Sequence, residues 1–587
     1  MSRISGSSYD SRLMSRSGDG STLSLDFTAM GGVLDPRLTF DRTSTATFVN
    51  SSGLVQFANA NLMTFSTPRS AGSSWLTSGT VTWGSATITD PLGNATAQEV
   101  TLGTVASAIF NTTGTTVVSG ITHTFSVWLR AASGTTNVRI GDANVAPVST
   151  VTLTTTWQRF NCQYVTNGTN DGGAIFSQTG TPSSTFYVWG AQVQPGSIVG
   201  DLLETTGSIR RNTPRFDYSP TNIGEPRGLL VEGQTANACP QSQALTTGWL
   251  NANMITPTNP AIADPFGGTS ATWKLVAASG NALHSWRHAV ITLTAAAYTF
   301  SFWAKAAEYD RVVLSDPGSG LGACTFVLTG NGTATVVGGA TNPQITPYPS
   351  GWYRCSVTMT SSATTYAFGI AGYPTTGTTL SNFGATYTGT GTDGAYATGL
   401  QIELGSGASS YIPTGASGVT RSADHCTMPT ASFIPSNPYP QTLFIECIPN
   451  TPSGAFLDIA RIFDRTAGGA FSYGTEIYYY NASTMTAQRK IGAATNTERN
   501  FATGLAYGTR HKFALSIDAS SFFGSYDGVT GLGVTTAPAA LSTVATHLGI
   551  GCSGEASPNV VMFGTIRQIK FYPTALSQSE INTLTTL

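Results

Sequence analysis

A nine-residue pattern that occurs twice constrains the fold more than any other feature of this 587-residue sequence. Residues 124–132 read TFSVWLRAA, and residues 299–307 read TFSFWAKAA. In both copies apolar residues alternate with a serine, a tryptophan and a basic residue, which is the period of a β-strand with two different faces. The spacing between the copies far exceeds the about 20–50 residues of a solenoid repeat. The pattern therefore predicts two complete β-domains in series.

The flanks of the two copies match as well. The matching pairs occur in the same order and are residues 90–93 (DPLG) with 264–267 (DPFG), 157–160 (WQRF) with 352–355 (WYRC), and 190–197 (GAQVQPGS) with 399–406 (GLQIELGS). Several ordered matches indicate a duplicated domain rather than one repeated strand.

Composition favours an all-β protein. Charged residues make up 10% of the chain, against about 25% in an average domain, while 40% of the residues are hydrophobic and 65 are glycine. The short apolar runs, the many Thr and Val residues and the frequent Gly turns are typical of strands. We expect tandem antiparallel β-sandwich (jelly-roll) domains with an extended N-terminal arm.

The same features exclude several partners. The formal net charge of −2 argues against nucleic acid, which requires a basic surface. The sequence has no apolar run near the about 20 residues of a membrane span, and its first residues lack the apolar core of a secretory signal.

The predicted organisation has seven parts. They are a flexible N-terminal arm (1–22), a β-rich attachment segment (23–60), module 1 (61–208), a connector (209–236), module 2 as a duplicate of module 1 (237–425), a Pro/Ser/Asn-rich linker (426–440) and a C-terminal sandwich (441–587). Ser577 and Glu580 predict a capping box for one short terminal helix. The seven scattered cysteines are interpreted as buried free thiols of a protein folded in a reducing cytoplasm, with a disulfide or zinc framework as the alternative.

Two resemblances attach to these segments. Residues 508–518, 524–528, 564–567 and 575–577 resemble the motifs of a concanavalin A-like or laminin-G-like jelly roll. Residues 34–40 and 214–232, together with the duplicated modules, resemble tailed-bacteriophage appendage proteins: tail fibres, tail spikes and head fibres. Those proteins carry carbohydrate-binding-module-like jelly rolls behind a virion-attached N-terminus.

The phage resemblance implies a location, partners and an assembly. We expect a protein on the virion surface that folds in the host cytoplasm without a signal peptide and forms a homotrimer. Its implied partners are other phage structural proteins and a host surface polysaccharide. From the residues themselves we expect the N-terminal arm, with Arg3, Arg12 and Arg16, to dock on an acidic particle surface, with a disordered tail without a role as the alternative. The C-terminal sandwich behind its linker is then the free tip that samples receptors.

The sequence shows no catalytic constellation. Glycoside hydrolysis needs two carboxylates about 5–10 Å apart, and most acidic residues here lie in turn motifs. Asp90 and Asp264 recur in a D-P-x-G motif, interpreted as a turn, with a structural calcium site as the alternative. We expect no other cofactor.

Aromatic residues carry the binding prediction, because sugar C–H faces pack on aromatic rings while sugar hydroxyls need polar partners. All ten tryptophans lie in or beside the modules. The candidate carbohydrate-binding residues are Trp83, Trp128, Arg130, Trp286, Trp303, Lys305 and Tyr479. The alternative for them is packing beneath loops or against another subunit, as we expect for Trp75 and Trp249.

Three functions remain open at this point. The first is a non-enzymatic virion appendage that binds host glycans. The second is a structural or capsid-decorating virion protein, which buried Trp128 and Trp303 would favour. The third is a polysaccharide depolymerase, which a groove with paired carboxylates would favour.

Overall fold

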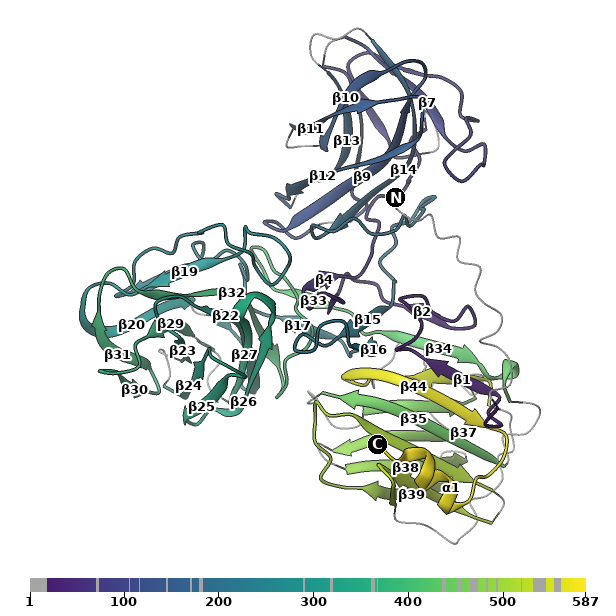
Figure 1. Ribbon diagram of the computed structural model, residues 1–587, viewed down its shortest axis with the longest axis vertical. Helices are drawn as coiled ribbons and strands as arrows, with labels where there is room; N and C mark the ends of the chain where they lie inside the picture. The colour runs from purple at the N-terminus through teal and green to yellow at the C-terminus, as the bar shows by residue number, and fades with distance from the viewer. Residues whose placement is uncertain are drawn as a thin grey trace.

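The computed structural model is almost entirely β-sheet (Figure 1). It describes residues 18–587 apart from 70–72, 105, 116, 144–145, 169–170, 179–182, 289–290, 317–319, 361–364, 367, 435–439, 451–456, 465–472, 482–483, 492–494, 519, 532–544 and 554–560. Most of the predicted arm, residues 1–17, lies outside this range. Within the described range the one α-helix is α1 (Gln578–Thr585), and Ser577 and Glu580 form the predicted capping box. No described helix has the length and apolarity needed to cross a membrane.

Module 1 is a sandwich of two five-stranded antiparallel sheets. One sheet has the order β11 (Ala146–Leu153), β10 (Thr136–Asp142), β13 (Gly172–Ser177), β8 (Ala108–Thr112), β5 (Leu76–Ser78). The other has the order β12 (Gln158–Val165), β9 (Thr122–Ala131), β14 (Ser184–Pro195), β7 (Gln98–Leu102), β6 (Val81–Trp83). Phe125, Val127 and Leu129 of β9 lie in the core between the sheets, so the alternate residues of β9 face outward.

Module 2 repeats this strand order and adds strands to it. Its larger sheet has the order β25 (Thr333–Gly338), β24 (Gly322–Val327), β23 (Arg311–Ser315), β29 (Gly369–Tyr373), β20 (Gly280–His288), β31 (Gly384–Gly389), β30 (Thr379–Ser381), with β18 (Trp249–Ala252) also paired to β20. The other sheet has the order β19 (Trp273–Val276), β32 (Gly394–Leu404), β22 (Ala297–Ala306), β27 (Trp352–Thr360), β26 (Thr341–Tyr348). A short pair, β21 (Ile291–Thr292) with β28 (Thr365–Tyr366), and a 3₁₀ turn (Pro349–Gly351) complete the module.

The duplication extends to an irregularity in the sheet. The pairing of β14 with β9 shifts register between Trp189 and Gln192, and the pairing of β32 with β22 shifts at the corresponding place. Gly190 and Gly399 lie at these bulges with φ of 62° and 63°. That backbone conformation favours glycine. The motif that begins at Gly190 and at Gly399 therefore marks the same β-bulge in both modules.

The C-terminal sandwich also consists of two sheets. The first has the order β15 (Arg215–Tyr218), β16 (Pro226–Val231), β44 (Gly564–Tyr572), β35 (Gln441–Pro449), β40 (His511–Ile517), β41 (Phe522–Tyr526), β42 (Val529–Thr530), and β1 (Leu23–Asp26) pairs with β44 beside β16. The second has the order β2 (Thr39–Asp41), β34 (His425–Pro429), β43 (His547–Ile550), β36 (Leu457–Phe463), β37 (Tyr473–Asn481), β38 (Thr484–Ile491), β39 (Thr495–Ala502).

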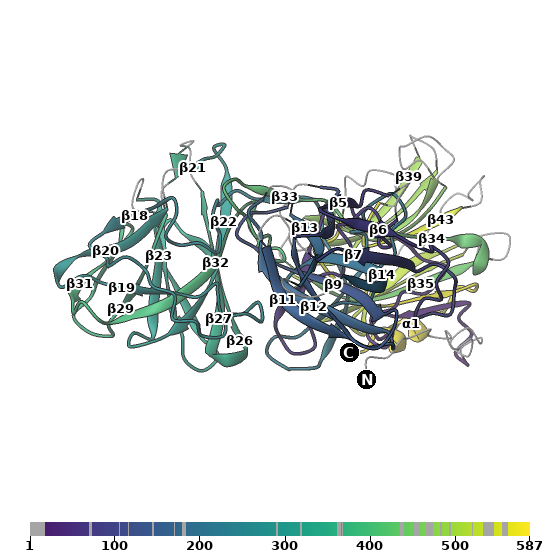
Figure 2. The same ribbon diagram turned by 90° about the horizontal axis from the view of Figure 1, so that it is seen from above.

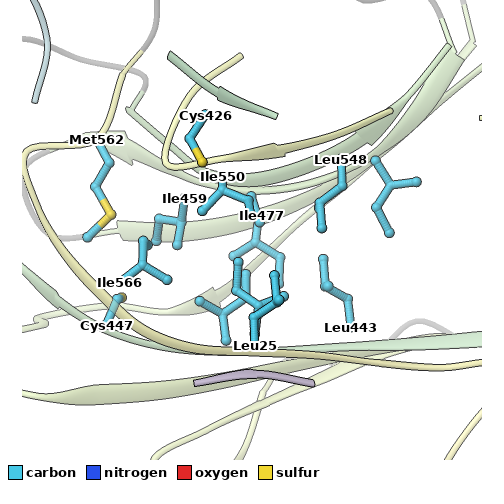
Figure 3. Close-up of a cluster of buried hydrophobic side chains, with 14 of the residues drawn as sticks. Leu25, Cys426, Leu443, Cys447, Ile459, Ile477, Leu548, Ile550, Met562 and Ile566 are labelled. Atoms are coloured by element: carbon cyan, nitrogen blue, oxygen red, sulfur yellow. The ribbon is translucent and has the colours of Figure 1, made fainter. Parts of the chain in front are cut away.

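These pairings correct the prediction of a self-contained C-terminal domain behind a linker. Strands from the attachment segment, the connector and residues 425–429 belong to the two sheets of the sandwich. Leu25, on the buried face of β1, lies among Ile477, Ile566 and Cys447 in the core (Figure 3). The physical reason is burial: the alternating apolar residues of β1 need a core, and the edge of β44 provides both hydrogen bonds and apolar contact.

All seven cysteines are free and buried, as predicted. Burial raises the pKa of the Cys324 thiol to about 12. They act as small apolar core residues.

A hub joins the three lobes. It contains the pairs β3 (Thr47–Val49) with β4 (Val55–Phe57) and β17 (Thr235–Asn237) with β33 (Val419–Arg421). Figures 1 and 2 show module 2 to one side of the line from module 1 to the C-terminal sandwich.

Buried ion pairs hold the hub together. Arg42 pairs with Asp424 at 3.0 Å, and Arg215 pairs with both Asp424 and Glu232. Arg421 lies 3.6 Å from Glu232. Burial favours the neutral acid, but Arg421 and Arg215 outweigh it and hold the pKa of Glu232 at about 2. Segments distant in sequence are thus joined by charges that lack access to water.

Candidate glycan-binding surface

Two aromatic rings and an arginine form a row on the outer face of module 1. Arg130 is directly opposite Tyr187 where β9 pairs with β14, and Trp157 immediately precedes β12. The guanidinium carbon of Arg130 lies 4.6 Å from the ring centroid of Tyr187 and 5.3 Å from that of Trp157. All three side chains are half-buried. The row therefore presents partly exposed aromatic and cationic side chains to solvent, held together by cation–π contact.

Local hydrogen bonds fix this row. The Trp157 indole Nε1 donates to the Thr89 carbonyl at 3.0 Å, which ties the ring to the turn before Asp90. Arg130 Nη1 donates to the Thr155 carbonyl at 3.5 Å. Within the described part of the chain, no carboxylate forms an ion pair with Arg130, and its Nε has no hydrogen-bond partner. The Nε is enclosed by protein, so Arg130 brings to this face a positive charge that no described carboxylate neutralises.

Module 2 has the same arrangement at the corresponding positions. Lys305 is opposite both Trp352 and Tyr396 in the sheet, as Arg130 is beside Trp157 and opposite Tyr187. Trp352 Nε1 donates to the Ala263 carbonyl at 2.9 Å, and this hydrogen bond is equivalent to that of Trp157 with Thr89. Trp303 corresponds to Trp128.

In module 2, however, this face is covered. Trp303 has no exposed surface, and its ring centroid lies 5.3 Å from Tyr411, 5.4 Å from Phe266 and 5.9 Å from Tyr348. Val55 of the hub belongs to the same apolar cluster. Its backbone N–H donates to the Pro265 carbonyl at 2.9 Å, so the hub is fastened to this face.

The sequence difference between the modules explains why one face is covered and the other is open. Leu92 stands in the D-P-x-G motif where module 2 has Phe266, and Leu92 is 52% exposed. Leu202 takes the position of Tyr411, counting from the shared bulge glycine. Leucines thus replace two of the three rings that cover Trp303, and Trp128 remains half-buried.

The structure corrects two of the predicted sugar-binding residues. Trp303 cannot stack on a sugar because it is covered. Trp286 is 5% exposed and its Nε1 donates to the Leu245 carbonyl at 2.6 Å. Trp286 lies on β20 and faces the core of module 2.

The other candidates are distributed over the molecule. Trp83 is half-buried on β6 and packs against the core of module 1, away from the row. Lys305 is half-buried on the covered face, and the side chain of Tyr479 lies outside the described residues. Trp75 and Trp249 are buried, as predicted for structural residues. Of the predicted set, Trp128 and Arg130 lie on the open face.

Sequence reasoning missed Trp157 and Tyr187. The signal for Trp157 was present, because it begins the matched WQRF motif. Tyr187 alternates with buried Phe186 and Val188 along β14, so its outward direction was readable once β14 was assigned to the same sheet as β9.

The two aspartates of the repeated turn accept hydrogen bonds from that turn. Asp90 Oδ1 accepts from the backbone N–H groups of Leu92 at 2.7 Å and Asn94 at 3.1 Å. Asp264 Oδ1 accepts from Phe266 at 2.9 Å and Gly268 at 2.8 Å, and burial raises the pKa of Asp264. This is the geometry of an Asx turn. Among described residues, no group of three or more His, Cys, Asp or Glu side chains is placed to hold a metal.

Comparisons with known proteins do not show which family this chain belongs to. The sequence matches no protein-family model and no curated protein. The CBM40 module of the Ruminococcus gnavus IT-sialidase, bound to α2,3-sialyllactose, is similar with 14% identity and a TM-score of 0.23, covering 26% of this chain and 84% of that chain. A SAP-like pentraxin from Limulus polyphemus gives 11% identity and 0.21, covering 26% and 73%. The receptor-binding domain of botulinum neurotoxin D gives 11% and 0.22, covering 27% and 41%. TM-scores this low carry no argument about function.

Proposed function

We propose that this protein binds host cell-surface glycans, without cleaving them, through the outer face of module 1. The observation that carries the proposal is the contrast between the two modules. The same sheet face is occupied in module 2, where it joins the hub, and is open in module 1, where smaller residues replace the covering rings.

The chemistry of the open face suits a sugar. Trp157 and Tyr187 supply aromatic surface for C–H contacts, while Arg130 between them supplies N–H donors for hydroxyl oxygens. Thr154 and Thr156, whose hydroxyls are 2.9 Å apart, flank Trp157 and add exposed polar partners. Mixed aromatic and polar surface at the centre of a patch is typical of recognition sites.

In this proposal the protein is a bacteriophage tail or head fibre. The support is that the modules and residues 34–40 and 214–232 resemble those of tailed-bacteriophage appendage proteins. The N-terminal arm would attach it to other virion proteins, and three copies would form the appendage. β1, which follows the arm, pairs with β44 of the C-terminal sandwich, and Asp19 forms an ion pair with Lys570 at 2.8 Å. Module 1 lies at the other end of the molecule (Figure 1). In this proposal module 1 is therefore the distal lobe, in place of the C-terminal sandwich that the sequence suggested as the free tip.

A panel of bacterial surface polysaccharides tests the proposal. Wild-type protein, Tyr187→Ala and Phe383→Ala would be compared on the immobilised panel. Phe383 is a matched control because it is an aromatic ring of module 2 that is 46% exposed. We expect wild type and Phe383→Ala to bind the same polysaccharide and Tyr187→Ala to bind at least about tenfold more weakly, a loss of about 1.4 kcal/mol. Equal binding by wild type and Tyr187→Ala, or no binding by wild type, would reject the proposal.

One observation favours a second candidate, the purely structural virion protein. Module 2 shows that this sheet face is suited to packing against protein. If an image of the assembled virion places another protein over Trp157 and Tyr187, the structural role replaces the glycan-binding one.

A further inference from the structure

A second candidate site lies far from the open face of module 1. A cleft of about 630 Å³ opens where module 2, the hub and the C-terminal sandwich meet. Its walls come from all three parts: Gln344 and Thr346 of β26 in module 2, Thr47 and Val49 of β3 in the hub, and Asp217 of β15, Arg227 of β16 and Asn450 in the C-terminal sandwich, with Glu225 in the loop between β15 and β16. Most of these side chains end in amide, hydroxyl or charged groups.

Asp217 is the unusual group in this cleft. It is 8% exposed, and its Oδ1 accepts a hydrogen bond of 2.8 Å from the backbone N–H of Val49. Within the described part of the chain, no other hydrogen bond or ion pair reaches this carboxylate. The second oxygen, Oδ2, accepts no hydrogen bond from a described residue and is not fully enclosed by protein. It is therefore available to a group that enters the cleft.

Donors line the same cleft. Burial raises the pKa of Asp217 and the charge of Arg227 opposes that rise, although the two groups form no ion pair within 4 Å in the described structure. Arg354 also lines the cleft, but its Nη2 donates to the Ser409 carbonyl at 2.6 Å and its Nε is enclosed by protein. The acceptor Asp217 and the guanidinium group of Arg227, which forms no ion pair in the described structure, thus face one cavity.

These charges select the class of ligand. An anionic ligand would be repelled by Asp217, and a cationic ligand would be repelled by Arg227 and Arg354. A hydroxyl group can donate to the carboxylate and accept from a guanidinium at the same time. We propose that this cleft binds a neutral, hydroxyl-rich ligand of oligosaccharide class, with Asp217 as the principal acceptor. The proposal is independent of glycan binding by module 1, because the two sites share no residue.

Saturation-transfer NMR on the full chain tests this proposal with two neutral trisaccharides, maltotriose and cellotriose, and with trigalacturonic acid as the anionic contrast. We expect saturable binding of at least one neutral trisaccharide and at least tenfold weaker binding of trigalacturonic acid. Asp217→Ala should lower the affinity for the neutral ligand at least tenfold, and Tyr187→Ala should leave it unchanged.

Two further comparisons make the result decisive. Asp217→Asn keeps an acceptor oxygen in the same place, so it should retain more affinity than Asp217→Ala, and thermal melting of each variant shows that it is folded. Absence of binding by both neutral trisaccharides, or equal affinity of wild type and Asp217→Ala, would overturn the proposal. Loss of binding in Tyr187→Ala alone would assign the ligand to module 1 and would also overturn it.

Discussion

Replacing Arg215 by methionine should destabilise the C-terminal sandwich strongly. Arg215 lies on β15 and pairs with both Glu232 and Asp424 without access to water. Removal of one member of a buried ion pair costs about 3–5 kcal/mol, because a buried charge is left behind. Here each acid retains one partner, since Arg421 lies 3.6 Å from Glu232 and Arg42 lies 3.0 Å from Asp424. We therefore expect the lower end of that range, about 3 kcal/mol.

Scanning calorimetry of the full chain measures this effect. For a domain of 150–250 residues, 1 kcal/mol corresponds to about 2–4 °C, so Arg215→Met should lower the Tm of the sandwich by about 6–12 °C. Arg210→Met is the control, because Arg210 is exposed and forms no ion pair within the described structure. It should change stability by no more than about 0.5 kcal/mol. Equal melting of Arg215→Met and Arg210→Met would show that the hub charges do not support the sandwich.

Three further predictions concern other parts of the fold. Burial outweighs the charge of Arg227 and raises the pKa of Asp217 to about 6; Arg215 and Glu232 are the other charges that face it. Because the protonated acid is favoured in the folded state, the stability of the protein falls as pH rises through 6. In urea unfolding, Asp217→Asn should therefore stabilise the protein by up to about 3 kcal/mol at pH 7 and hardly at pH 4. Gly399→Ala should destabilise module 2 by at least about 1 kcal/mol, because φ is 63° and a Cβ would lie 2.7 Å from the Trp303 ring; Gly190→Ala, whose nearest neighbour is the movable end of Leu202, should lower the Tm less. Ser577→Ala removes the cap of α1 and should cost about 1 kcal/mol in the same unfolding measurement.

The sequence predicted the local features of the fold well. Alternation in residues 124–132 placed Phe125 and Val127 in the core and Trp128 and Arg130 on the other face. The repeated motifs predicted a duplication, which the shared order of the central strands in the two modules displays. The terminal helix was predicted by its capping residues, because a capping box is a local interaction.

The long-range features could not be predicted in the same way. The burial of Trp303 depends on Tyr411, Tyr348 and Phe266, which are brought together only by the folded module. Short strands such as β1 fit the edge of any sheet, so alternation alone does not reveal that Leu25 completes the C-terminal core. Trp286 has no counterpart in module 1, and its place on β20 follows from strand pairing rather than from its neighbours in sequence.

The most direct test of the open face uses the matched pair Arg130→Ala and Lys305→Ala. These residues hold corresponding positions between two aromatic side chains, one on the open face and one on the covered face. The measurement is the affinity of each full-length variant for the bacterial surface polysaccharide that the wild-type protein binds. The account predicts that Arg130→Ala binds at least tenfold more weakly than wild type and that Lys305→Ala binds like wild type. Equal affinity of both variants, or loss in Lys305→Ala alone, would contradict it.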